Sequence, residues 1–205
     1  MAKIKLTKGE LKRQRDSLGQ FRHYLPTLQL KKQQLQMKIN EARGIIKERQ
    51  KDLDKKVGAI ELWVGLLGDS SVDINEWITP ESVSVDTVNI AGANVPVYKD
   101  IRFKQADHDL YATPLWIDKG VEELQGMVTL LAEIDILKKR IDILKHELRI
   151  TTQRVNLFEK IKIPECLENI RVIRIYLGDQ QANAVGVSKV AKKKIEAAAL
   201  EEMLV

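Results

Sequence analysis

The chain has 205 residues, of which 31% are charged and only 5% aromatic, a composition typical of long helices packed along their length rather than of an aromatic-rich globular core. Its net charge of +5 is concentrated in an N-terminal stretch and in a second group of lysines near the other end, which predicts a basic pole if the termini lie together. The single cysteine excludes a disulfide framework, and the lack of long apolar runs argues against a signal peptide or a membrane-spanning helix.

Residues 1–67 are predicted to form one long helix of a coiled coil. Stepping by sevens from Leu11 meets apolar residues as far as Leu67, with Lys32 as the only interruption. A companion series three residues further on is also apolar, apart from interruptions at Gln14, Arg49 and Lys56. Near the end, Val57 and Val64 suggest that the apolar stripe drifts around the helix. Pro26 predicts a kink or a local irregularity.

Residues 68–114 form an insert of a different character. Three of the five prolines lie here, and apolar and polar residues alternate on both sides of Ala91-Gly92-Ala93-Asn94. This pattern predicts a β-hairpin over residues 83–101 with a four-residue turn. Because an isolated hairpin is marginally stable, we expect it to lean on a helix or on another protein.

Residues 115–178 repeat the heptad, with one apolar series from Met127 to Val155 and a second from Leu130 to Phe158. Pro164 interrupts the helix, a stripe resumes from Leu167 to Leu177, and Gly178 is expected to end it. Residues 179–205 form an alanine- and lysine-rich tail. The predicted fold is therefore all-α: a long antiparallel two-helix coiled coil with a small β-hairpin insert between the helices.

Active-site signatures are missing from the sequence. There is no phosphate-binding loop and no dinucleotide-binding glycine motif, and the three histidines have no metal-ligand partners at suitable spacing. Cys166 lies in an apolar helical stripe and is predicted to be a small buried hydrophobic residue. We therefore predict no catalytic residues, no cofactor and no bound metal.

The segment from Gln153 to Pro164, with its Arg-Val-Asn and Ile-Pro elements, closely resembles the D subunit of the vacuolar/archaeal-type rotary ATPases. The segment from Leu28 to Leu35 is similar more loosely, with Gln33-Gln34 where that family carries an Arg-Asp pair, and the insert around Gly92 and the basic ending also fit. The resemblance marks Lys31, Lys32, Arg154, Val155, Asn156, Pro164, Lys192 and Lys193 as family-motif or partner-contact residues.

The resemblance implies a non-catalytic rotor axle that transmits torque between the catalytic A and B subunits and the membrane rotor of a proton- or sodium-translocating ATPase or ATP synthase. It also implies the F subunit and a membrane-rotor coupling subunit as partners. The expected location is cytoplasmic, peripheral to the membrane, without direct insertion and without nucleic acid. Two alternatives remain open at this point: a prefoldin-like chaperone or other coiled-coil scaffold, and a rod that binds nucleic acid through its basic pole. The second would require aromatic residues among the lysines and arginines, and only Phe21 and Tyr24 offer them.

Overall fold

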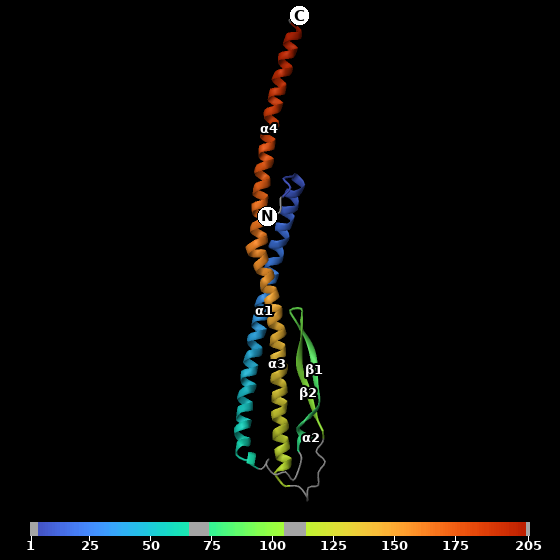
Figure 1. Ribbon diagram of the computed structural model, residues 1–205, viewed down its shortest axis with the longest axis vertical. Coiled ribbons are helices and arrows are strands. Elements are labelled where there is room, and N and C mark those ends of the chain that lie inside the picture. The colour runs from blue at the N-terminus through green and yellow to red at the C-terminus, as the bar shows by residue number, and fades with distance from the viewer. Residues whose placement is uncertain (1–3, 66–73, 105–113, 204–205) are drawn as a thin grey trace. The chain divides into compact units, whose positions relative to one another are not determined.

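The computed structural model describes residues 4–65, 74–104 and 114–203, and Figure 1 shows long helices with a two-stranded hairpin between them in the chain. The elements are α1 (Lys8–Glu61), α2 (Asn75–Ile78), β1 (Pro80–Ile90), β2 (Ala93–Phe103), α3 (Ile117–Leu157), the π-helical segment η2 (Phe158–Lys162) and α4 (Ile163–Met203). The predicted fold class is confirmed. The chain divides into a terminal unit, residues up to 29 and from 153 onward, and a middle unit, residues 30–152.

The heptad of α1 marks the face of the helix that is shielded from solvent. Every position of the two series from Leu11 to Ile60 is buried or half-buried, and Leu35, Ile39 and Ala42 are fully buried. The predicted drift of the stripe is wrong, because Val57 and Val64 are exposed while Ile60 is buried. Pro26 lies inside α1 without ending the helix. Leu67 lies outside the described residues.

In the middle unit, α1 and α3 run antiparallel, and side chains on the two helices pair across the seam. Lys31 contacts Glu147, Arg49 contacts Glu133, and Lys56 contacts Glu123. Residues further along α1 therefore pair with residues earlier in α3, which is the order expected of antiparallel helices. A core cluster joins both helices to the second strand. Its buried members are Leu35, Ile39, Ala42, Ala93, Val95, Ile141 and Leu144. The hairpin therefore packs on the helix pair, as an otherwise marginal two-stranded sheet requires.

The hairpin is longer than predicted and its turn is tighter. Strands β1 and β2 pair antiparallel from Pro80 opposite Phe103 to Ile90 opposite Ala93, with irregularities near Ser82 and Val85. The predicted four-residue turn is wrong, since Ala93 and Asn94 belong to β2 and the turn consists of Ala91 and Gly92. Both turn residues have positive φ, 50° and 82°, as a type I′ turn requires. The side chain of Asn89 supports the turn by accepting a hydrogen bond from the Gly92 amide at 3.0 Å.

Helix α3 passes through η2 into α4 without a break. Pro164 cannot donate a backbone hydrogen bond, and its ring would clash with the carbonyl four residues earlier in a regular α-helix. The five residues of η2 lie just before this proline, and the Ile163 amide donates to the Phe158 carbonyl, a π-helical spacing. The predicted helix end at Gly178 is wrong, because α4 continues through that glycine to Met203. A Cβ added at Gly178 would meet nothing within 4 Å, so this residue faces open space.

Candidate functional site

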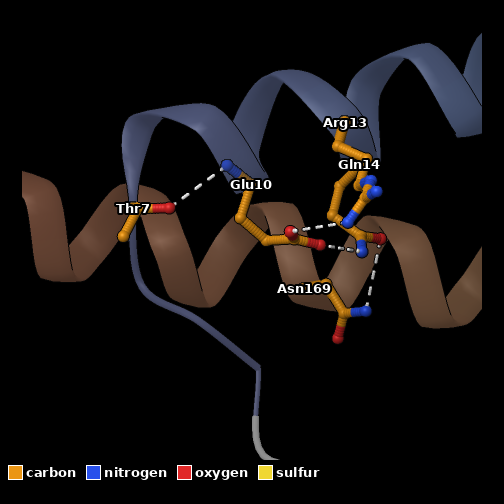
Figure 2. A network of polar contacts seen from close by, with 5 residues as sticks. All are labelled: Thr7, Glu10, Arg13, Gln14 and Asn169. Atoms are coloured by element: carbon orange, nitrogen blue, oxygen red, sulfur yellow. Dashed lines mark hydrogen bonds and ion pairs between the residues drawn. The ribbon is translucent and has the colours of Figure 1, made fainter.

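The start of α1 is tied to α4 by a chain of polar contacts within the terminal unit (Figure 2). Thr7 caps the helix, and its hydroxyl accepts a hydrogen bond from the Glu10 amide at 3.2 Å. The Glu10 carboxylate accepts from Gln14 at 2.9 Å and lies 3.8 Å from Arg13. Gln14 in turn accepts from the Asn169 amide at 3.4 Å, which connects α1 with α4. Gln14, a polar interruption of the predicted heptad, therefore pairs across the seam.

The Arg-Val-Asn element divides between the seam and the surface. Val155 is buried, with 3% of its surface accessible, while Arg154 and Asn156 on either side are exposed. Phe158 packs against Phe21 of α1, with ring centroids 5.0 Å apart. Pro164 is exposed on the α4 surface. Val155 is therefore placed to hold the helix pair together, and Arg154, Asn156 and Pro164 are accessible to a partner.

The two lysines of the N-terminal family segment lie in the middle unit. The ammonium nitrogen of Lys31 lies 3.7 Å from the Glu147 carboxylate. It also lies close to the hairpin turn, 3.6 Å from the position that a Cβ on Gly92 would occupy. Lys32 is half-buried. These two residues thus belong to a different unit from the other six predicted site residues, and the eight form no single described cluster.

A second polar group lies in the middle unit where β2 meets the helices. Arg49 pairs with Glu133 at 2.8 Å, and both line a cavity of about 150 Å³ together with Tyr98 and Arg140. Burial raises the pKa of Tyr98, and the charges of Asp100 and Glu133 raise it further. The Nε atom of Arg140 is buried without a hydrogen-bond partner among the described residues. This cluster fixes the hairpin against both helices.

The carboxylates Glu123, Glu133 and Glu147 pair with cations of α1 across the helix seam, and the sequence analysis did not single them out. Glu133 and Glu147 each directly precede an apolar residue of the α3 stripe, Ile134 and Leu148. That is a flanking position from which a charged side chain reaches the partner helix of a coiled coil. The signal was present in the sequence, because the interrupting cations Arg49 and Lys56 require acidic partners if they lie at the seam.

The last part of α4 has no partner helix within the described chain. Residues 178–197 are exposed throughout. Lys192 lies 3.6 Å from Glu196, and Lys193 is exposed beside it. Four large apolar side chains of this segment also face solvent, each more than half exposed: Val185, Val187, Val190 and Ile195. Of these, Val187 and Val190 are three residues apart and lie on the same face of the helix. This segment offers apolar and basic groups in several directions.

The described residues include neither a metal-binding cluster nor an activated cysteine. No group of His, Cys, Asp and Glu in that part of the chain is arranged to hold a metal ion. Burial raises the pKa of the Cys166 thiol, and the nearby Glu165 carboxylate raises it further, so the thiol stays protonated and unreactive near neutral pH. The predicted burial of Cys166 is confirmed, with 5% of its surface accessible. The helices in the described part of the chain contain no apolar stretch of the length needed to span a bilayer.

Comparison with known proteins gives a consistent result along almost the whole chain. The sequence pattern of the family described as the ATP synthase D subunit matches residues 10–193. The V-type ATP synthase D subunit of Borreliella burgdorferi is 46% identical over 195 residues, which cover 95% of this chain and 96% of that protein. The protein of the same description from Chlamydia pneumoniae is 33% identical, covering 94% and 93%. Its counterpart from Chlamydia trachomatis serovar L2 is 32% identical, covering 95% and 97%.

Proposed function

The chain belongs to the ATP synthase D-subunit family, and we propose that it is the non-catalytic central-stalk subunit of a V/A-type rotary ATPase. In this role it transmits torque between a catalytic hexamer of A and B subunits and the membrane rotor of a proton- or sodium-translocating complex. Its place is cytoplasmic and peripheral to the membrane, within that membrane-bound complex.

The observation that carries this proposal is the set of polar pairs across the helix seams. A shaft under torque must resist sliding of one helix along the other, and apolar heptads alone permit a shift by seven residues. The pairs Lys31–Glu147, Arg49–Glu133 and Lys56–Glu123 define the register in the middle unit. Gln14–Asn169 does the same in the terminal unit. Any slip would separate these partners, so the pairs favour a rigid, register-locked helix pair.

The proposal assigns separate partners to separate parts of the chain. The exposed α4 segment over residues 178–197, with its lysines and solvent-facing valines, supports contact with the A and B subunits. The hairpin and the helix pair beneath it supply the contact with the F subunit or the membrane-rotor coupling subunit. Strand β1 is exposed along almost its whole length, which leaves a free edge and face for such a partner.

Two variants test this division in pull-downs with separately purified partners. Deleting residues 185–205 removes the lysine group and the outer valines, and the expected result is weaker association with the A and B subunits and unchanged binding of the F subunit. Replacing residues 83–101 with a short flexible linker is expected to do the reverse. Circular dichroism of both variants serves as the folding control. If both variants lose the same partner to the same extent with intact helices, the assignment of partners is wrong.

The non-catalytic role has its own test on the isolated chain. The described residues form no metal-binding cluster, and the sequence has no phosphate-binding loop. We expect isothermal titration calorimetry with ATP and Mg²⁺ to give no saturable heat, and the chain to release no phosphate. Saturable binding that one point substitution in this chain abolishes would contradict the proposal.

A further inference from the structure

A groove of about 520 Å³ runs between α1 and α4 in the terminal unit. Its floor is apolar, because Leu18 and Ile170 lie at the seam between the helices and the more exposed Leu167 and Ile175 extend the floor outward. Gly19 keeps the α1 side open, since an added Cβ there would meet nothing within 4 Å. The volume lies within the range of roughly 300–1,000 Å³ that is usual for ligand pockets.

Arginine side chains surround this apolar floor. The four are Arg15, Arg22, Arg171 and Arg174. Arg171 already holds a carboxylate in the two-pronged geometry typical of arginine, donating to both oxygens of Glu168 at 2.9 and 2.6 Å. The other three form no ion pair with any residue in the described part of the chain. The groove therefore presents guanidinium groups that are free to bind further carboxylates.

The backbone around the groove restricts the kind of ligand. Both walls are interior turns of long helices, whose amide groups are used within the helix, so they offer no cradle of N–H donors for a phosphate. The floor is aliphatic and carries no aromatic ring on which a nucleic-acid base could stack. Apolar contact with flanking arginines instead matches an amphipathic segment that has aliphatic side chains on one face and acidic ones beside them.

Building on the proposed function, we propose that this groove binds an acidic amphipathic helix of a partner protein in the complex. Leucine-like side chains of that helix lie on the floor of Leu18, Leu167, Ile170 and Ile175, and its carboxylates pair with Arg15, Arg22 and Arg174. The aliphatic contact provides the burial, and the arginines select an acidic partner and set its orientation.

The first test uses a defined probe and the full chain. A fluorescein-labelled peptide with leucines on one helical face and glutamates beside them is titrated by fluorescence anisotropy. The combined variant Arg15→Gln, Arg22→Gln, Arg174→Gln is expected to weaken binding roughly tenfold or more. The matched control Lys47→Gln, Lys51→Gln, Lys139→Gln removes the same charge from exposed positions outside the groove and is expected to bind as the parent chain does.

The floor is tested separately with Leu167→Ser and Ile175→Ser, both at exposed positions, so that the fold is preserved. Weaker binding by these variants, and no binding of a peptide with its leucines changed to serine, supports the groove. Equal losses in the arginine variant and its charge-matched control overturn the proposal, because attraction is then non-specific. Groove-dependent binding of anionic lipid vesicles or of an oligonucleotide, without binding of the acidic peptide, also overturns it.

A second test separates this inference from the proposed function. A photo-crosslinking amino acid replaces Gly19 in the chain, which is then purified with its complex. A crosslink to an acidic helical segment of a partner protein supports the groove. If the chain purifies with the A and B subunits but crosslinks to no acidic segment, the groove proposal is wrong and the proposed function stands. If the chain purifies with no other ATPase component, the proposed function fails first.

Discussion

Leu144 on α3 is completely buried in the cluster that joins α1, α3 and the hairpin. Truncating such a side chain removes its transfer free energy and leaves a cavity, which together cost about 2–5 kcal/mol. We expect Leu144→Ala to lower the free energy of unfolding by that amount in urea denaturation. Leu131→Ala, at a half-exposed position of the same helix, is the control and is expected to cost much less. Equal losses would contradict the packing described for this cluster.

The pair Lys56–Glu123 predicts a pH dependence. The hydrogen bond and the charge of Lys56, at 2.8 Å, lower the pKa of Glu123 below its ordinary value of 4.5. Because the pKa of Glu123 is lower in the folded state than in the unfolded state, the ion pair stabilises the fold at pH values above the unfolded-state pKa. This contribution is lost as the pH falls through the folded-state pKa. Since both side chains are more than one-third exposed, we expect only roughly 0.2–1 kcal/mol at neutral pH.

The measurement is a comparison of Lys56→Gln with the parent chain by urea denaturation at neutral pH and at a pH well below 4.5, the ordinary pKa of Glu123. The stability difference is expected to be present at neutral pH and to shrink in acid. Lys47→Gln, at an exposed position of the same helix, is the control for loss of one positive charge. A difference that grows as the pH falls would contradict the assigned role of Glu123.

At the scale of elements, substitutions at the two residues of the hairpin turn are expected to change its stability in opposite directions. Ala91 adopts a φ of 50°, a left-handed conformation that costs a residue with a Cβ roughly 1–2 kcal/mol, and Gly92 follows with a φ of 82°. Ala91→Gly is therefore expected to stabilise the hairpin by up to about 1 kcal/mol, and Gly92→Ala to destabilise it by a similar amount. Amide hydrogen exchange in β1 and β2 measures both. Faster exchange in Ala91→Gly would contradict the turn assignment.

The heptad predicted most of the seam, including the polar positions Gln14, Arg49 and Lys56, because a repeat near 3.5 residues defines one face of a helix regardless of which residue occupies it. The heptad did not predict burial correctly at positions where an apolar residue faces away from the partner helix. Val57 is apolar but exposed, and Leu167 is less buried than Cys166 beside it. Periodicity does not reveal which of two adjacent apolar residues faces the partner helix.

Glycine and proline signals were the least reliable guides to the ends of elements. Gly178 has the usual signature of a helix end, yet α4 continues, because helix-forming residues follow it and a glycine within a helix costs only about 1 kcal/mol. Pro164 is accommodated by the π-helical segment before it rather than by a break. The groove could not be found from the sequence, since its arginines come from segments about 150 residues apart that meet only when the helices pair.

At the scale of the whole molecule, an axle differs from a passive scaffold because it has to transmit torque from the catalytic subunits to the membrane rotor. Under the proposed function, the polar pairs across the seams of both units keep the helices in register while partner subunits act on different parts of the chain. A scaffold would tolerate a flexible seam. Coupling of ATP hydrolysis to ion movement therefore distinguishes the two roles better than binding does.

The most direct test is ATP-driven ion uptake into vesicles that contain the reconstituted complex. Three preparations are compared: the complex with the full chain, the complex assembled without it, and the complex with the chain lacking residues 185–205. ATP hydrolysis by the catalytic subunits is recorded in each, so that loss of coupling is distinguished from loss of the motor. The axle account predicts uptake with the full chain, none without it, and sharply reduced uptake with the shortened chain. Undiminished uptake in the absence of the chain would contradict it.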